Sequence, residues 1–364
     1  MKRVLLLIIL CSFNFLFGQD LYKINIYLQY KADGDGRKIC ESWSKIILNY
    51  EDGTKEEVMT ETSTQYTKNL NLSKPKRINS VYFEGYARRK ATSDIFGGCN
   101  GDDENPKKTI ILNNCIVSTY NDSGDNNATS ISYKISTQQL PIHSLKTDVI
   151  DNSQPTPLYN TYLPSDDKIN IYDKAGFSPE LYHYQYTLTP EDKSSWKDIN
   201  SSLYVNEKLS ITGEDLFGAD YINHIGKKVY FRAVSCPDAN GEYQSWSEPL
   251  FLTLIQSAPH IQNSTISHPL CSYSADGKVT LDFDRKLFTE EILQAVLIDK
   301  ATNSAINNYD LTDSLQNSTQ YTINDLDAGE YILKLSRGSY QGQPTYTDSP
   351  THNIEFIITK TYSR

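Results

Sequence analysis

The stretch from Lys227 to Ile255 reads KKVYFRAVSCPDANGEYQSWSEPLFLTLI and contains two β-type runs around a turn rich in Pro, Asp, Asn and Gly. In the first run, three apolar residues alternate with their neighbours: Val229, Phe231 and Ala233. The second run places four apolar residues on one parity, Trp246, Leu250, Leu252 and Leu254, although Pro249 is expected to reset it. Alternation with a period of two on both sides of a loop predicts a β-hairpin, and Pro249 fits at a strand start or edge. We expect this hairpin to close a β-sandwich domain.

The same alternation recurs along most of the 364 residues. The clearest case is residues 22–30, where one face carries Tyr22, Ile24, Ile26, Leu28 and Tyr30. The chain has 26 Tyr and only two Met, a composition that suits half-buried pleated surfaces better than helices. Residues 213–225 are predicted to form one short helix. The predicted fold class is therefore all-β, with β-sandwich domains in tandem.

Breaks in the alternation divide the chain. Residues 1–18 are predicted to be a signal peptide, and residues 19–117 a first β-sandwich-like domain. Residues 118–140, which begin with a segment rich in Asn, Asp and Ser, are predicted to be a linker. Residues 141–257 and 258–364 are predicted to form two further β-sandwiches.

The amino-terminal segment has the pattern of an export signal. Lys2 and Arg3 precede the apolar run of residues 4–10, and cleavage after Gly18 would leave Gln19 first. Lipidation of Cys11 is disfavoured because the position before it holds Leu10 and not a small residue. We expect an exported protein, extracellular or at the cell surface, with the periplasm as the alternative. No later segment is apolar enough to cross a membrane.

Charge and cysteine content narrow the possible partners and the cellular compartment of the protein. The net charge of −10 argues against a nucleic-acid partner, because phosphate neutralisation by basic residues supplies most of that affinity. The mature chain holds an odd number of cysteines: Cys40, Cys99, Cys115, Cys236 and Cys271. Export permits disulfides, and we hypothesise a bridge between Cys236 and Cys271 that joins the second and third domains. Separate buried thiols are the alternative.

Two groups of residues resemble known modules. Trp196, the run around Phe231 and the sequence Ser245–Pro249 (SWSEP) resemble a fibronectin type III-like module. Cys271–Gly277 (CSYSADG) and Asp325–Tyr331 (DLDAGEY) resemble the Ig-like repeats of gliding-motility adhesins and related modular surface proteins of Bacteroidetes. The resemblance implies Ig-like and fibronectin III-like sandwiches and a surface-associated protein, and it carries no catalytic residue.

The resemblance also places three residues in structural roles. Trp196 is expected in the core of the second sandwich together with Phe231. Tyr331 is expected at the corner where a Tyr hydroxyl caps the backbone of Ig-like sandwiches. The chain departs from the family because it ends at Arg364, just after a strand, without a recognisable secretion-sorting domain. We therefore expect either the amino-terminal part of a longer protein or export that stops at the periplasm.

The sequence lacks the common motifs of catalytic and metal-binding sites. None of the six His forms a metal-ligand motif, and there is no nucleophile elbow, P-loop or dinucleotide fingerprint. We therefore assign no catalytic, cofactor-binding or metal-binding residue. Three acidic segments could offer oxygen ligands to calcium, or could be solvated turns: Asp33-x-Asp35, Asp102–Glu104 and Asp122–Asn127. Six aromatic residues could stack on sugars: Tyr22, Tyr27, Tyr182, Tyr184, Tyr243 and Trp246.

These observations favour a non-catalytic surface protein that acts as an adhesin, a scaffold or a protein-interaction region. The first alternative is a carbohydrate-binding accessory module, which an exposed aromatic platform on a sheet would favour. The second is the amino-terminal region of a larger toxin-like secreted protein. The expected partner is a protein or a surface glycan, and no cofactor is expected.

Overall fold

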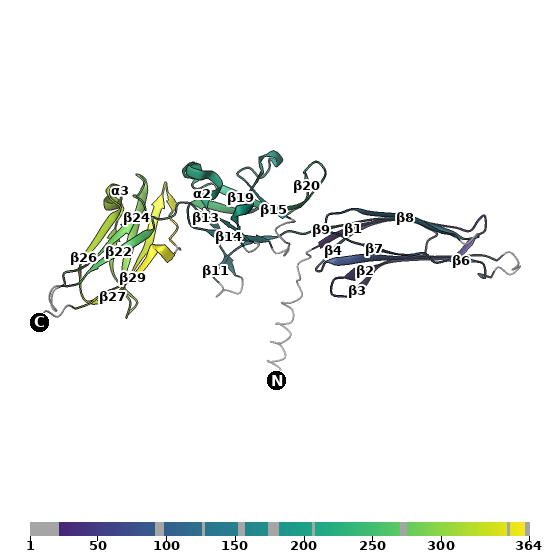
Figure 1. Cartoon of the computed structure of the whole chain (residues 1–364), viewed down its shortest axis with the longest axis horizontal. Helices are drawn as coiled ribbons and strands as arrows, with labels where there is room; N and C mark the ends of the chain where they lie inside the picture. The colour runs from purple at the N-terminus through teal and green to yellow at the C-terminus, as the bar shows by residue number, and fades with distance from the viewer. Residues whose placement is uncertain are drawn as a thin grey trace, which may run out of the picture. The chain divides into compact units, whose positions relative to one another are not determined.

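A computed structural model describes residues 22–91, 98–125, 128–151, 157–173, 182–205, 208–269, 275–347 and 350–360. Strands dominate these residues, with short helical turns between them (Figure 1). The chain divides into two compact units: the first comprises Met1–Leu145, Asp173–Tyr184 and Arg232–Glu248, and the second comprises Lys146–Tyr172, Gln185–Phe231 and Pro249–Arg364. The fold is a series of β-sandwiches, as the alternation predicts. Residues 1–18, the expected signal peptide, lie outside the described residues.

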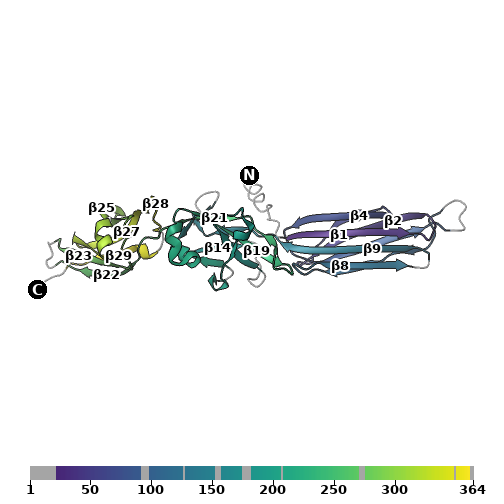
Figure 2. The same cartoon turned by 90° about the horizontal axis from the view of Figure 1, so that it is seen from above.

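The first sandwich lies in the first unit and has two sheets. One sheet has the order β4 (Gln65–Lys74), β1 (Tyr22–Asp33), β9 (Ser130–Pro141) and β8 (Ser118–Asp125), and Figure 2 shows these strands side by side. The other has the order β3 (Lys55–Glu61), β2 (Ile39–Tyr50) and β5 (Ile78–Arg89), and β5 also pairs with β6 (Asp103–Glu104) and β7 (Lys107–Ile111). Every second residue of β1 from Ile24 to Tyr30 is buried, so its predicted inner face is confirmed. Each such side chain contributes about 1.5–3 kcal/mol.

The predicted linker at residues 118–140 is wrong. These residues form β8 and β9, and β9 pairs with β1 along its whole length, from Tyr22 opposite Pro141 to Asp33 opposite Ser130. Ile131, Tyr133 and Ile135 complete the hydrophobic core of the first sandwich. The first sandwich therefore extends to Pro141, beyond the expected boundary at 117.

The middle of the chain forms the sheets of the second sandwich. One has the order β10 (Leu145–Thr147), β14 (Ile169–Asp173), β18 (Lys208–Ile211) and β17 (Tyr204–Val205). The other has the order β13 (Tyr162–Pro164), β21 (Leu250–Ile255), β19 (Lys228–Pro237), β15 (Tyr182–Thr187) and β16 (Lys197–Asp198), with β20 (Tyr243–Trp246) also on β19. β11 (Val149–Asp151) and β12 (Leu158–Tyr159) form a small ribbon. β13 joins β21 in parallel.

The predicted hairpin is β19 with β20 and β21. Phe231 is fully buried, and Leu252 lies opposite Val229. The returning strand is interrupted between β20 and β21, where the Ala233 N–H donates to Ser247 Oγ. The alternation of buried and exposed residues is not continuous across this break, so Trp246, on the β20 side, is 58% exposed although Leu252 and Leu254 are buried. Trp196, expected in the core, is only partly buried, because it follows the turn η1 (Lys193–Ser195) and leads into β16, a two-residue exposed edge strand.

The predicted helix is present as two pieces, α2 (Gly213–Phe217) and η3 (Gly218–His224). Thr212 caps α2: its hydroxyl accepts from the Asp215 N–H, and the Asp215 carboxylate accepts from the Thr212 N–H. This reciprocal capping box satisfies backbone donors that the first turn would otherwise leave unpaired.

The third sandwich lies wholly in the second unit. One sheet has the order β22 (Ile261–Ser267), β23 (Gly277–Phe283) and β26 (Gln320–Leu326). The other has the order β25 (Ser304–Asp310), β24 (Glu291–Asp299), β27 (Gly329–Tyr340) and β28 (Gln343–Pro344), with β29 (Asn353–Ile358) also on β27. A short helix, α3 (Thr312–Asn317), follows β25. The Tyr331 ring is buried and its hydroxyl donates to the Asp327 carbonyl at 2.9 Å, which is the capping contact of the predicted corner.

Two disulfides lie in the first unit, Cys40–Cys99 and Cys115–Cys236. The expected bridge between Cys236 and Cys271 is therefore wrong for Cys236, and Cys271 lies outside the described residues. The reason is the fold of residues 118–141: Cys115 N–H donates to the Gln139 carbonyl of β9, which holds Cys115 where its Cα is 5.1 Å from that of Cys236.

Candidate functional site

The outer side of the sheet β4–β1–β9–β8 carries a continuous array of polar side chains. We call it the polar face; its residues are Asn25, Tyr27, Gln29, Lys31, Gln65, Thr67, Asn69, Asn71, Thr119, Asn121, Ser123, Ser132, Lys134, Ser136 and Gln138. All are exposed or half-buried. Because successive side chains of a strand point to opposite sides, the residues that alternate with them fill the core, and this face is left for solvent or a partner.

Strand register arranges the polar face in cross-strand rows. Gln29 lies opposite Thr67 on one side and Lys134 on the other, and Lys134 lies opposite Asn121. Neighbouring rows are built in the same way, with Tyr27 between Asn69 and Ser136. Directly opposed side chains on neighbouring strands are within reach of one another. The rows therefore hold amide, hydroxyl and ammonium groups at spacings set by the rigid sheet.

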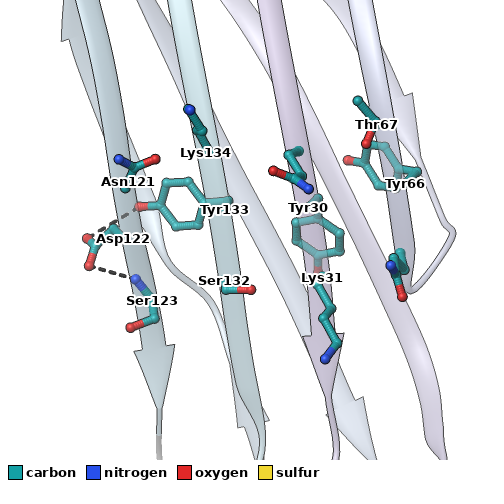
Figure 3. A pocket seen from close by; sticks show the side chains of 12 residues that line it. Tyr30, Lys31, Tyr66, Thr67, Asn121, Asp122, Ser123, Ser132, Tyr133 and Lys134 are labelled. Atoms are coloured by element: carbon teal, nitrogen blue, oxygen red, sulfur yellow. Dashed lines mark hydrogen bonds between the residues drawn. The ribbon is translucent and has the colours of Figure 1, made fainter.

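The polar face is hollowed at one end. A shallow depression of about 970 Å³ is lined there by polar-face residues and by the tyrosines Tyr30, Tyr66 and Tyr133 (Figure 3). A second hollow of about 320 Å³ lies around Tyr27. In Figure 3 the Tyr133 hydroxyl points to Asp122, which accepts this hydrogen bond at 3.5 Å.

Charge on this side of the sheet is nearly balanced, although the whole chain has a net charge of −10. The polar face contains Lys31 and Lys134, and the outward positions that continue it along the same strands add Lys23, Asp33 and Asp125, with Lys31 3.6 Å from Asp33. Asp122, on the edge strand, accepts hydrogen bonds from the Tyr120 hydroxyl and the Ser123 N–H, which lower the pKa of its carboxyl. This side of the sheet therefore offers mainly neutral hydrogen-bonding groups, with charges of both signs among them.

The aromatic residues considered for sugar stacking lie on two sheets and differ in exposure: Tyr182, Tyr184, Tyr243 and Trp246 are on β15 and β20 of one sheet, and Tyr22 and Tyr27 are on β1 of another. Tyr184 is buried, Trp246 is exposed and Tyr27 is half-buried on the polar face, while the side chain of Tyr182 lies outside the described residues. The outer side of the other sheet of the first sandwich holds Trp43 and Tyr86, which stack on each other at 5.5 Å between ring centroids. Each of these rings also lies near a cation, so their faces are already in contact.

The acidic segments considered for calcium are engaged by other groups. Asp102 pairs with Arg89 at 2.5 Å, and Asp103 pairs with Arg88 at 3.3 Å. Asp33 accepts a hydrogen bond from the Asp35 N–H, as in a tight turn. Asn127 lies outside the described residues. Asp33, Asp102 and Asp103 therefore act in a turn and in ion pairs, whereas burial and the nearby carboxylates of Asp125 and Asp103 raise the pKa of Glu104.

A Ser–His–Asp arrangement lies inside the first unit. His143 Nδ1 contacts Asp173 Oδ2, and His143 Nε2 lies 2.7 Å from Ser235 Oγ. This order matches the catalytic triad of serine hydrolases. However, Ser235 is 1% exposed, the side chains of His143 and Asp173 are fully buried, and Asp173 Oδ1 is occupied by the Ser144 N–H. A nucleophile must reach its substrate, so the arrangement acts as a buried polar network.

A serine-directed probe tests this assignment. We expect a fluorophosphonate to leave the folded protein unlabelled, because the Ser235 hydroxyl is covered by protein on all sides. The measurement is intact mass after overnight incubation, with a serine hydrolase as the positive control. Stoichiometric labelling that disappears in Ser235→Ala would contradict the assignment.

A second polar cluster, in the second unit, unites residues that sequence reasoning did not connect. Asp167, in the loop between β13 and β14, meets His260 and His352, which are far from it and from each other along the chain. No local spacing links the three, so a search for metal-ligand motifs has nothing to find. Only the topology brings them together.

Comparisons with known proteins concern the fold alone. No family model matches this sequence, and no curated protein matches it. Among solved structures, the chicken interferon gamma receptor alpha chain is similar at 12% identity over 58% of this chain and 96% of its own, with a TM-score of 0.33. The FN1–FN3 domains of chicken CNTN1 are similar at 8% identity over 91% and 99%, with a TM-score of 0.28. A tetra-tandem repeat from the extending region of a large adhesion protein is similar at 10% identity over 92% and 75%, with a TM-score of 0.20.

The helices in the described part of the chain are short, and none of them has the length and apolarity needed to cross a bilayer.

Proposed function

We propose that this chain is an exported, non-catalytic surface protein that acts as an adhesin or scaffold and contacts its partner through the polar face. The observation that carries the proposal is the set of cross-strand rows of amide, hydroxyl and lysine side chains beside a hollow. Fixed rows of amides and hydroxyls suit a polar partner, because a rigid sheet loses little backbone entropy on binding.

Export is supported by the two disulfides. Bridges persist in oxidising compartments and are rare where thiols are kept reduced. Four of the five cysteines of the expected mature chain take part in Cys40–Cys99 and Cys115–Cys236. The amino-terminal signal pattern agrees with this compartment.

Charge reversal on the polar face tests the proposed function. Beads carrying the full mature chain are tested for retention on surfaces coated with acidic or neutral proteins, and on an array of neutral and acidic glycans. We expect Lys31→Glu/Lys134→Glu to weaken binding roughly tenfold, since two rim charges worth up to about 1 kcal/mol each become repulsive.

The matched control is Lys278→Glu/Lys334→Glu, which makes the same charge change at two exposed positions on strands of the third sandwich. It should bind like the unmodified chain. Equal weakening by both variants would mean that net charge and not the polar face governs binding. Retention by neither coated proteins nor glycans would contradict the proposal.

A carbohydrate-binding role is the second candidate. Tyr27 favours it, because this half-buried ring is flanked by Asn69 and Ser136 beside a hollow. An aromatic ring among amides and hydroxyls can stack on a sugar while its neighbours bind hydroxyl groups. Binding confined to glycans on the array, and lost in Tyr27→Ala, would select this role over protein adhesion.

A further inference from the structure

Four side chains that can bind a metal ion come together beside the chain segment that leads into the third sandwich, all within the second unit. His260 Nε2 lies 3.2 Å from Asp167 Oδ1 and 3.6 Å from Asp166 Oδ1, and His352 Nδ1 lies 3.9 Å from Asp167 Oδ2. The ligand atoms of Asp167, His260 and His352 all lie within 4.8 Å of one another. The two imidazole rings are perpendicular, with centroids 4.8 Å apart.

These atoms lack the partners that buried polar atoms normally have. Asp166 Oδ1, Asp167 Oδ2, His260 Nε2 and His352 Nδ1 are all buried and make no hydrogen bond. The side chain of His352 is fully buried, and that of Asp167 is 12% exposed. Buried polar atoms are hydrogen-bonded in the great majority of cases, because leaving one unpaired costs about 1–3 kcal/mol. Three of these residues, Asp167, His260 and His352, hold their ligand atoms close together, and Asp166 Oδ1 lies 3.6 Å from one of them, so the cluster calls for an occupant.

Hydrogen bonds from neighbouring residues fix both histidines in the way that is typical of metal ligands. His352 Nε2 lies 2.8 Å from the Ala258 carbonyl, so this nitrogen carries the proton and Nδ1 presents its lone pair to the cluster. Metal-bound histidines usually donate their other N–H to a carbonyl or carboxylate in this way. The backbone of His260 is fixed by two hydrogen bonds with Asp284, one from each residue's N–H.

The spacing and chemistry of the donors fit one class of ion. In a tetrahedral zinc site with ligand distances of about 2.0–2.1 Å, neighbouring donors are about 3.3 Å apart. The separations of 3.2, 3.6 and 3.9 Å, which involve both oxygens of Asp167, are close to that value, and the set with one ligand atom per residue, which spans up to 4.8 Å, would have to contract around the ion. Calcium and magnesium prefer oxygen ligands, whereas two imidazole nitrogens with carboxylate oxygens select Zn²⁺ or a neighbouring transition metal.

We propose that Asp167, His260 and His352, with Asp166 as the fourth ligand, bind a structural Zn²⁺ ion. The ion would tie the β13–β14 loop of the second sandwich to the residues before β22 and before β29 of the third. The site is separate from the polar face and does not depend on the function proposed for it.

A buried ion pair without a metal is the competing account. The carboxyls of Asp166 and Asp167 raise the pKa of His260 to about 10, which describes a charged imidazolium between two carboxylates. That arrangement leaves His352 Nδ1 without a hydrogen-bond partner, because Asp167 Oδ2 is 3.9 Å away from it. The nearby guanidinium of Arg285 is held by both oxygens of Glu291 and so is largely neutralised. A bound metal ion would give each of the four side chains a partner, whereas the ion pair leaves His352 Nδ1 without one.

Metal titration of the untagged mature chain tests the proposal. After removal of bound metal with EDTA and dialysis, calorimetry with ZnCl₂ should show one site with Kd at or below the micromolar range. Co²⁺ should give the intense visible bands of a tetrahedral site. At a free Zn²⁺ concentration of about 100 times Kd, the melting temperature of the transition containing the third sandwich should rise by roughly 5–10 °C.

Two ligand variants and a control locate the ion. Asp167→Asn and His260→Gln should each weaken Zn²⁺ binding by at least about a hundredfold, more than the roughly 10–100-fold lost when a residue that only hydrogen-bonds a ligand is replaced. The control is His224→Gln, which removes a partly buried His that pairs with Asp220 and belongs to no cluster of three ligand residues in the described part of the chain; its Kd should stay within about threefold of that of the unmodified chain. The proposal is overturned if the folded, metal-free chain takes up no Zn²⁺, or if both ligand variants bind as tightly as the control.

Discussion

Replacing Glu291 with Gln is expected to destabilise the third sandwich by about 3 kcal/mol, the lower end of the cost of breaking a buried ion pair. The Glu291 carboxylate is fully buried at the start of β24 and binds Arg285 with both oxygens, at 2.7 and 2.9 Å. It also accepts the Phe288 N–H at 3.1 Å. An amide at this position leaves the guanidinium without its counter-charge and turns one acceptor into a donor. We take the lower end because Arg285 is 22% exposed.

Hydrogen exchange measures this effect locally, since a chain of several sandwiches does not unfold in one step. The slowest amides of β24 and β27 should exchange with a free energy of opening about 3 kcal/mol lower in Glu291→Gln. Glu330→Gln is the matched control: Glu330 lies on β27, is 55% exposed and is 3.8 Å from Lys300. That exposed pair should be worth less than about 1 kcal/mol. Equal exchange in the two variants would show that the buried pair does not stabilise the sandwich.

A double variant separates the contribution of the charges from that of packing. Arg285→Met/Glu291→Leu should recover much of the loss, because a buried ion pair replaced by apolar residues of similar size is often no less stable. Recovery should be incomplete, since Arg285 also donates to the Ser257 and Lys286 carbonyls. A double variant less stable than Glu291→Gln would mean that these carbonyl contacts dominate.

Alternation predicted the strands whose side chains pack the core. β1, β19 and β27 each bury every second residue over a stretch, and their positions could be predicted from residues such as Phe231 and Tyr331. The corner contact of Tyr331 was also predictable, because a local sequence pattern encodes it. Strands that bury a regular apolar face are visible in a single sequence for this reason.

Residues 118–141 show where this signal fails. β8 is an edge strand without a buried side chain, so its polar sequence resembles a loop and only backbone pairing makes it a strand. In β9 the alternation continues through Thr137 and Gln139, which are buried although polar. Gln139 can be buried there because its side-chain amide forms hydrogen bonds with both the N–H and the carbonyl of Ile78. A polar residue that replaces a missing backbone partner cannot be told from a surface residue by composition.

The candidate sites were hidden for a related reason. The polar face looked like ordinary solvent-facing positions until the register placed Tyr27, Gln29 and their neighbours in rows. The partner of Cys236 depended on the fold of residues 118–141, because that fold brings Cys115 beside it. Contacts between residues a hundred positions apart leave no pattern in the local sequence.

Removing the bridge Cys40–Cys99 is expected to lower the stability of the first sandwich by about 4 kcal/mol, the chain-entropy value for a loop of about 60 residues. The two cysteines are 59 positions apart. The native contacts of the bridged segment do not need the sulfur atoms: Gly101 N–H donates to the Arg89 carbonyl, and Arg89 pairs with Asp102. The folded state should therefore persist in Cys40→Ser/Cys99→Ser, and the loss should arise mainly from the freer unfolded chain.

Trp43 lies three residues from Cys40 and stacks on Tyr86, so its fluorescence reports this sandwich when Trp196 and Trp246 are replaced by Phe. In that background the serine variant should melt roughly 15 °C lower. Cys271→Ser, which takes part in neither bridge, should melt like the parent. Reductant should bring the parent down toward the serine variant, and any further fall of the serine variant itself measures what Cys115–Cys236 adds. A serine variant as stable as its parent would mean that the unfolded chain is already restricted around residues 40–99, so that closing the loop there costs little entropy.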